Sequence, residues 1–118
     1  MRGSVIRKSN TVAALQNTIV SIASITLKEK HSYLVFGIVA SSISNFNSTI
    51  SSRIIVTSGT TSDISGNIET RGSMAMGGGV LNCRYIKTNT ECIVELNSYG
   101  YANEEYSLTG NLFSVQLD

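Results

Sequence analysis

The chain has 118 residues, a length that suits one domain with a single hydrophobic core. Charged residues make up 14% of it and the net charge is +1, so we expect no nucleic acid partner and no attraction to an anionic membrane. Apolar residues make up 42%, and the polar remainder is mainly Ser, Thr, Asn and Gly, which is typical of strands and tight turns. The longest apolar stretches, 19–27 and 33–40, are too short for a membrane-spanning helix, so we expect no membrane insertion.

The first residues do not predict a secretory signal. Met1, Arg2, Gly3 and Ser4 match the start of an expression tag and also fit a native start, and no basic region with an apolar core follows them. We therefore expect no signal peptide. We predict a single β-sandwich domain over residues 1–118, of which residues 1–4 could derive from a tag.

The segment 12–27 fits two kinds of secondary structure. Val12, Leu15, Ile19 and Ile22 follow helical spacing, and a polar residue within 9–11 could cap such a helix. Residues 19–27 are rich in β-branched side chains, which favour an extended chain. We predict a strand for residues 19–27.

The expected strand at residues 31–40 bears most on assembly, because it is apolar on both faces. Each sheet of a sandwich normally shows one face to water, so such a strand needs a second covering surface. A partner subunit would supply one, and loops of the same chain are the alternative. One face carries Leu34, Phe36, Ile38 and Ala40, and the other carries Tyr33, Val35, Gly37 and Val39.

Three further stretches alternate between apolar and polar residues as half-buried strands do. Residues 49–56 place Ile50, Ile54 and Val56 on one face. Residues 80–86 and 91–96 alternate in the same way, and together they predict an amphipathic hairpin. Turns are predicted at 58–59, 65–67 and 97–100, where Gly and Asn tolerate a positive φ. Turns spaced this closely favour a sandwich or a barrel.

The predicted hairpin carries both cysteines of the chain. A turn at Lys87 and Thr88 would place Cys83 opposite Cys92, at a separation close to what a disulfide needs. A turn centred on Asn89 would shift the register, and two unbridged thiols would then fill a core face, as free cysteines commonly do. Both alternatives stay open at this point.

Residues 107–118 form an expected strand that runs almost to the last residue. Its apolar side chains change phase, because Leu108 is even-numbered whereas Phe113, Val115 and Leu117 are odd-numbered. One extra residue near Gly110, a β-bulge, would produce that change. A strand of this kind is expected to hold the chain end inside a sheet.

The sequence lacks the residue patterns of an enzyme or a metalloprotein. His31 is the one histidine, and no Gly-x-Ser-x-Gly elbow would activate a serine. Cys83, Cys92 and the distant histidine match no zinc-ligand spacing. Glu104 and Glu105 are chain neighbours, which on a strand point to opposite faces and so do not pair as the acids of a glycosidase. We expect no catalytic residue, no metal and no cofactor.

Aromatic and amide side chains near the end of the chain favour recognition of a carbohydrate. A sugar ring packs its C–H face on an aromatic side chain, while its hydroxyls bind amides and carboxylates. The alternative is that the tyrosines are half-buried at the edges of the sandwich. The candidate ligand-binding residues are Phe46, Asn97, Tyr99, Tyr101, Asn103, Glu104 and Tyr106.

Three stretches together resemble a known family. They are Tyr33-Leu34-Val35-Phe36-Gly37, then Ile93-Val94-Glu95-Leu96 leading to Ser98-Tyr99-Gly100, and finally Leu108-Thr109-Gly110-Asn111-Leu112-Phe113-Ser114-Val115-Gln116-Leu117. They resemble the C-terminal head domains of phage and prophage tail-fibre or baseplate proteins from Gram-positive bacteria. These heads are similar to the jelly-roll trimers of the tumour-necrosis-factor and C1q class. The resemblance implies an all-β fold, a two-sheet antiparallel β-sandwich of jelly-roll type.

The resemblance also implies a homotrimer in which one sheet of each protomer packs about the threefold axis. The doubly apolar strand at residues 31–40 is compatible with such an interface. The target would be a saccharide or receptor on the host cell surface. The protein would be made in the host cytoplasm and would act in the virion tail or outside the cell. The predicted interface residues are Tyr33, Val35, Val39 and Phe113.

We therefore expect a noncatalytic receptor-binding or adhesion head of a viral or prophage tail structure, which recognises host-surface carbohydrate as a homotrimer. Two other functions stay open: a structural cap that holds a trimeric fibre together without binding a ligand, and a carbohydrate-binding module of a secreted protein. The oligomeric state separates the first two functions from the third. Glycan binding separates the head from the cap.

Overall fold

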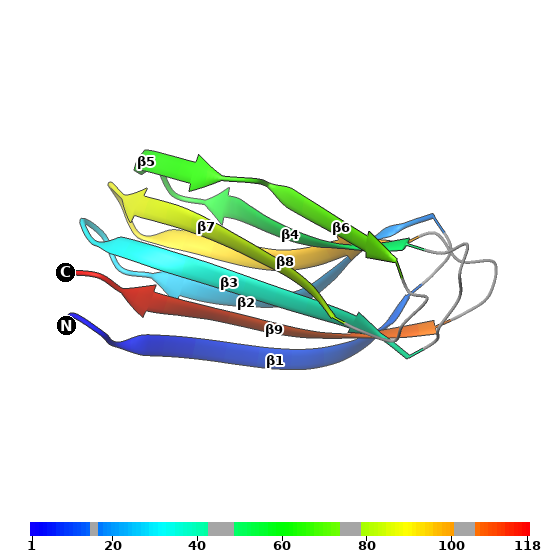
Figure 1. The fold of residues 1–118 in the computed structure, drawn as a ribbon. Coiled ribbons are helices and arrows are strands. Elements are labelled where there is room, and N and C mark those ends of the chain that lie inside the picture. The colour runs from blue at the N-terminus through cyan, green and yellow to red at the C-terminus, as the bar shows by residue number, and fades with distance from the viewer. Residues whose placement is uncertain (15–16, 43–48, 74–78, 101–105) are drawn as a thin grey trace.

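A computed structural model describes residues 1–14, 17–42, 49–73, 79–100 and 106–118 of the chain (Figure 1). Every regular element in these residues is a strand, as the alternating sequence predicts. The strands are β1 (Val5–Ala14), β2 (Ile19–Leu27), β3 (Ser32–Ser41), β4 (Thr49–Ser58), β5 (Thr61–Gly66), β6 (Glu69–Ser73), β7 (Val80–Thr88), β8 (Cys92–Tyr99) and β9 (Tyr106–Gln116).

The strand pairs are nested like those of one long hairpin. β1 pairs with β9, β2 with β8, β3 with β7, and β4 with β6, all antiparallel. A second set of pairs then joins β9 to β3, β8 to β4, and β7 to β5. This set rolls the hairpin into two sheets, so the fold is a β-sandwich of jelly-roll type, as predicted.

Successive strands alternate between the two sheets. Sheet A has the order β1-β9-β3-β7-β5 and sheet B has the order β2-β8-β4-β6. The apolar core lies between them and includes Leu27, Val35, Ile54, Leu96 and Leu112, none of which is exposed to solvent. Both termini lie at one end of the sandwich (Figure 1). The ends of β3, β6 and β8 lie at the opposite end.

Strand β2 confirms the prediction for residues 19–27, and β1 shows that residues 5–14 are extended rather than helical. The predicted hairpin of residues 80–96 is wrong. β7 belongs to sheet A and β8 to sheet B, because the connection between them crosses the sandwich. The glycines of two predicted turns, Gly59 and Gly66, have φ values of 90° and 97°. The turn predicted at 97–100 is wrong over residues 97–99, which continue β8.

The predicted bulge in the last strand is also wrong. β9 keeps one register with both of its neighbours, and its even-numbered residues point inward from Tyr106 to Gln116. The odd-numbered Phe113 and Val115 therefore lie on the outer face of sheet A. The apolar phase change in the sequence reflects two apolar faces on one regular strand. As predicted, the strand holds the chain end inside a sheet, because it runs between β1 and β3.

Two glycines of sheet A make room for one leucine of sheet B. A Cβ atom on Gly37 would lie 2.7 Å from Leu96 Cδ1, and one on Gly110 would lie 2.9 Å from Leu96 Cδ2. Real Cβ atoms do not approach other atoms this closely. The absence of side chains at both positions lets the two sheets pack closely around Leu96.

Two polar side chains lie on the inward face of β7, between the buried Val80 and Ile86. Asn82 is 4% exposed and Arg84 is 8% exposed. The amide nitrogen of Asn82 donates to the carbonyls of Ser52, Asn67 and Ile68 at 3.3, 3.0 and 3.1 Å. These bonds hold the connection between β5 and β6, where the chain crosses from one sheet to the other.

Arg84 lies two residues further along the same face of β7. Its Nη1 donates to the Ile54 carbonyl at 2.9 Å, while its Nε is buried without a hydrogen-bond partner. Burial lowers the pKa of the guanidinium below its usual value. Asn82 and Arg84 point inward together with Val80 and Ile86, whereas Leu81, Cys83 and Tyr85 point outward.

Candidate functional site

The outer face of sheet A carries a continuous apolar surface. Ladder partners across β9, β3 and β7 bring Val115, Leu34 and Tyr85 into one row, and Phe113, Phe36 and Cys83 into the next. A third row continues with Ile38 and Leu81, and Val5 of β1 extends the first row. We call this surface the A face; it comprises Val5, Leu34, Phe36, Ile38, Leu81, Cys83, Tyr85, Phe113 and Val115.

Two phenylalanines lie at the centre of the A face. Phe36 and Phe113 are direct ladder partners, and their rings stack with centroids 4.9 Å apart and an interplanar angle of 15°. The Arg7 guanidinium lies over the Phe113 ring, 5.5 Å from its centroid. Such contacts hold the side chains in a defined arrangement and leave an aromatic surface open to a partner.

The A face is exposed to an unusual extent for large apolar side chains. Leu81 is 55% exposed and Val5 is 53% exposed, while Leu34, Phe36 and Phe113 are half-buried. Single exposed apolar residues are ordinary, but a contiguous patch over four strands is typical of an interaction surface. This confirms that β3 is apolar on both faces, and no described loop of the chain buries its outer face completely.

The predicted interface residues need correction. Tyr33, Val35 and Val39 lie between the two sheets and are at most 1% exposed, so they belong to the core of the protomer. Phe113 is the one predicted interface residue that lies on the outer face. The prediction selected the wrong face of β3, because alternation distinguishes two faces without saying which one meets the other sheet.

The cysteines do not face each other. Cys83 lies on the A face and Cys92 is buried in the core, and both are free. Burial raises the pKa of each thiol above its usual value. The hydrogen atom of Cys92 Sγ lies near the carbonyls of Thr60 and Thr90, both 3.3 Å from the sulfur. Neither thiol has the depressed pKa of a reactive nucleophile.

The candidate ligand-binding residues do not form one exposed surface in the part of the chain that the structure describes. Tyr99, at the end of β8, is half-buried on the outer side of sheet B. Asn97 is 6% exposed, and its amide both accepts from Arg53 Nε and donates to Glu95 Oε2, each at 2.9 Å. Tyr106 is 5% exposed, its hydroxyl has no hydrogen-bond partner, and burial raises its pKa. Phe46, Tyr101, Asn103 and Glu104 lie outside the described residues.

Asn97 belongs to a polar strip that crosses all four strands of sheet B. Ser21 of β2 donates to Glu95 of β8, and Arg53 of β4 lies 3.7 Å from Glu69 of β6. Arg71 Nε completes the strip, 3.2 Å from Glu69 Oε2. Along this strip the outer face of sheet B is hydrophilic, in contrast to the A face, and most of its polar side chains bond to one another. Sequence reasoning found Asn97 and missed its partners, because they come from four different strands.

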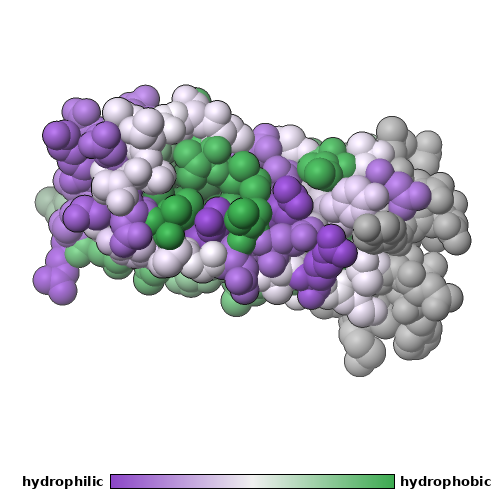
Figure 2. All heavy atoms as spheres, turned by 90° about the horizontal axis from the view of Figure 1, so that it is seen from above, coloured by the Kyte–Doolittle hydropathy of each residue, from purple (hydrophilic) through white to green (hydrophobic). Residues whose placement is uncertain are grey.

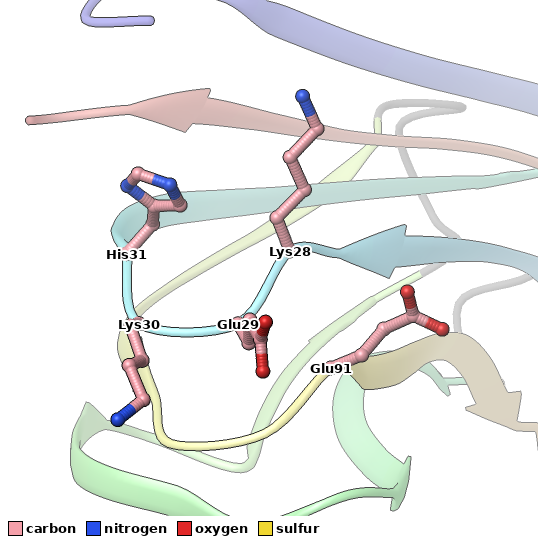
Figure 3. Close-up of a pocket in the computed structure, with 5 residues that line it drawn as sticks. All are labelled: Lys28, Glu29, Lys30, His31 and Glu91. Atoms are coloured by element: carbon pink, nitrogen blue, oxygen red, sulfur yellow. The ribbon is translucent and has the colours of Figure 1, made fainter.

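A surface pocket of about 700 Å³ lies at the end of the sandwich that holds the termini (Figure 3). Its lining residues carry charges of both signs. The Thr88 hydroxyl donates to the carbonyl of Lys28, one of these residues, at 2.6 Å. Figure 3 shows Lys28 and Lys30 pointing in different directions, so their ammonium groups do not converge on one ligand position. The lining residues are Lys28, Glu29, Lys30, His31 and Glu91.

His31 lies at the rim of this pocket beside the last residue. His31 Nδ1 is 3.2 Å from Asp118 Oδ1 and 3.3 Å from Gln116 Nε2. The hydrogen bond from the Ser32 amide is the main cause that lowers the pKa of the Asp118 carboxyl below its usual value; desolvation opposes it, and His31 adds to the lowering. No serine or cysteine nucleophile joins His31 in these contacts. No group of three or more His, Cys, Asp or Glu residues suited to a metal occurs in the part of the chain that the structure describes.

No protein-family model, curated protein or solved structure matches this chain. Within the described residues, no helix is long and apolar enough to span a membrane.

Proposed function

We propose that this chain is a noncatalytic receptor-binding head of a viral or prophage tail structure, and that it acts as a homotrimer assembled through the A face. The A face is the observation that carries the proposal. Burial of apolar surface is the main driving force of association, and stable interfaces between identical subunits are rich in aromatic and aliphatic side chains at their centres. The stacked Phe36 and Phe113 rings provide such a centre.

The position of Tyr99 relative to the two termini supports the role of a receptor-binding head. Tyr99 lies at the end of the sandwich opposite both termini, as do the ends of β3 and β6 (Figure 1). A fibre joined near a terminus would therefore present Tyr99 away from the shaft. Tyr99 combines an aromatic ring with the amide and carboxylate groups of the neighbouring polar strip, which suits a saccharide of the host surface.

Sedimentation equilibrium tests the assembly part of the proposal. We expect the wild-type chain to be a trimer at micromolar concentration, and Phe113→Ser to be a folded monomer, because the substitution removes the central ring of the A face. Ile93→Ser is the matched control, because Ile93 is 40% exposed on the outer side of sheet B and should leave the trimer intact. A wild-type monomer at tens of micromolar would overturn the proposal.

A structural trimerisation cap is the second candidate, and the burial of Asn97 and Tyr106 favours it, because it removes two residues from the expected saccharide surface. A glycan array and a host-cell pull-down distinguish the two functions. Binding by the trimer that is lost in Tyr99→Ala supports the receptor-binding head. A folded trimer that binds neither glycans nor host cells supports the cap.

A further inference from the structure

A positively charged side chain lies between the two sheets without a counterion. Arg84 is 8% exposed, and it forms no ion pair with any residue that the structure describes. The acids of the neighbouring strands lie on other surfaces: Asp63 lies beside Lys87 on the outer face of sheet A, and Glu69 pairs with two arginines on that of sheet B. A buried charge without a partner is unfavourable, so a bound anion would stabilise this position.

The hydrogen bonds of the Arg84 guanidinium show where an anion would bind. Nη1 donates to the Ile54 carbonyl at 2.9 Å, whereas Nε is buried without a partner. Nη2 also makes no hydrogen bond with a described residue, but it is not fully buried. Nε and Nη2 form one edge of the guanidinium, and their two parallel N–H groups match the two oxygens of a carboxylate. A bidentate donor edge is therefore free, and Nη2 is its accessible half.

Arg84 lies near the side of the sandwich where the two sheets separate. Its ladder partner is Gly66 on β5, the outermost strand of sheet A, and this partner has no side chain. The Ile54 backbone accepts from Arg84 and donates to the carbonyl of Ile68, where the chain passes from β5 to β6. Of the described strands, none continues the line of β6 along the second half of β4. A small ligand can therefore approach the guanidinium from this side.

The surface around this approach is apolar. Ile68 is 52% exposed, and Ile64 is 36% exposed on the side of β5 that turns toward sheet B. Figure 2 looks onto this side and shows apolar side chains, drawn in green, gathered over it, with hydrophilic atoms, drawn in purple, among them. One cation with an apolar rim suits a ligand that has one negative charge and an apolar group, because a dianion would carry an excess charge into apolar surroundings.

We propose that Arg84, together with Ile64 and Ile68, forms a binding site for a monocarboxylate that carries an apolar group. The carboxylate bonds to Nη2, and to the adjacent Nε when the flanking side chains move aside, while the apolar group packs on the two isoleucines. We call this the Arg84 site. The inference goes beyond the proposed function, because it requires neither a trimer nor a saccharide.

Isothermal titration calorimetry with four small probes tests the class of ligand. We expect the wild-type chain to bind hexanoate at least about tenfold more tightly than acetate, because the longer chain buries more apolar surface. Hexanol, which has no carboxylate, and inorganic phosphate, which has no apolar group, should both bind more weakly than hexanoate. No detectable binding of hexanoate, or binding no tighter than that of phosphate, would overturn the proposed site.

Arg84→Met tests the role of the guanidinium and should weaken hexanoate binding by at least about tenfold, because it removes the bidentate donor. Lys87→Met is the matched control, since Lys87 is exposed on the outer face of the same strand and its loss removes the same charge. It should leave the affinity for hexanoate unchanged. Circular dichroism verifies that each variant folds.

Ile64→Glu provides a second test that keeps Arg84 in place. The new carboxylate would lie on β5 next to the ladder partner of Arg84 and should occupy the free edge of the guanidinium, so hexanoate binding should be lost. Unchanged affinity for hexanoate in a folded Ile64→Glu variant would show that the ligand binds elsewhere. A wild-type monomer that binds hexanoate would overturn the proposed trimer and leave the Arg84 site intact.

Discussion

Asn82 lies in the core on β7, where its side chain contributes hydrogen bonds rather than apolar contacts. Its Oδ1 accepts from the Cys83 amide and from Thr70 Oγ1, while its nitrogen serves three backbone carbonyls. The buried carbonyls at the crossing between β5 and β6 are satisfied in this way. A buried polar group is tolerated only when its hydrogen bonds are complete, and Asn82 meets that condition.

Replacing Asn82 by Leu should lower the free energy of unfolding by about 2–4 kcal/mol, because several buried backbone groups lose their partner at once. Urea denaturation followed by circular dichroism measures the change. Asn89→Leu is the control, since Asn89 is exposed and its loss should change stability by no more than about 0.5 kcal/mol. Equal effects of the two substitutions on stability would show that the hydrogen bonds of Asn82 do not stabilise the connection between β5 and β6.

Gly37 and Ser114 provide a contrasting pair on the inward faces of neighbouring strands. Gly37→Ala should cost about 1–3 kcal/mol, because the new methyl group would overlap Leu96 Cδ1. Ser114→Ala should be neutral or stabilising, since the buried Ser114 hydroxyl has no hydrogen-bond partner to lose. Thermal melts of both variants measure the difference. A Gly37→Ala variant as stable as the wild type would mean that the sheets adjust around Leu96 at little cost.

At the scale of elements, β9 contributes to both the core and the outer surface of sheet A. It runs between β1 and β3 in the middle of sheet A, its even-numbered side chains close the core, and its odd-numbered side chains build the A face. A single regular strand thus contributes to the core through one face and to the A face through the other. The sequence predicts the strand and its apolar content, but it does not predict which residues face the core.

A chain that ends at residue 111 should fail to fold, because it lacks the buried Leu112 and about half of the ladder through which β9 joins β1 to β3. Near-ultraviolet circular dichroism and amide dispersion in a proton NMR spectrum report on this. Removal of Asp118 alone is the control and should leave a folded domain, since that residue is exposed beyond the end of β9. A cooperative unfolding transition in the chain that ends at residue 111 would contradict the central role of β9.

At the scale of the whole molecule, the outer faces of the two sheets differ at their centres. Sheet A presents an apolar surface, whereas sheet B presents a strip of hydrogen-bonded and charged side chains from Ser21 to Arg71. An assembled particle would bury the first and show the second to water. The accessibility of the Cys83 thiol should show whether the A face is covered, because Cys83 lies on the A face while Cys92 lies in the core.

Thiol labelling should therefore depend on assembly. If the proposed trimer forms, Cys83 should react slowly with a neutral maleimide in the wild-type protein and at least about tenfold faster in the Phe113→Ser variant, because dissociation uncovers the A face. Mass spectrometry of the labelled peptides measures both rates. Cys92 serves as the internal control and should stay unlabelled in both proteins while they are folded. Equal Cys83 labelling in trimer and monomer would place the interface elsewhere.

The sequence by itself determined the class of fold, most strand positions and the presence of a strand that is apolar on both faces. Local alternation and turn residues are sufficient for these, because each depends only on neighbours along the chain. The tertiary structure alone decided which face of β3, β7 and β9 turns inward. It also separated Cys83 from Cys92 and brought the A face together from four strands. Those outcomes depend on pairing between residues far apart in the chain, and a pattern of period two is the same whichever face meets the opposite sheet.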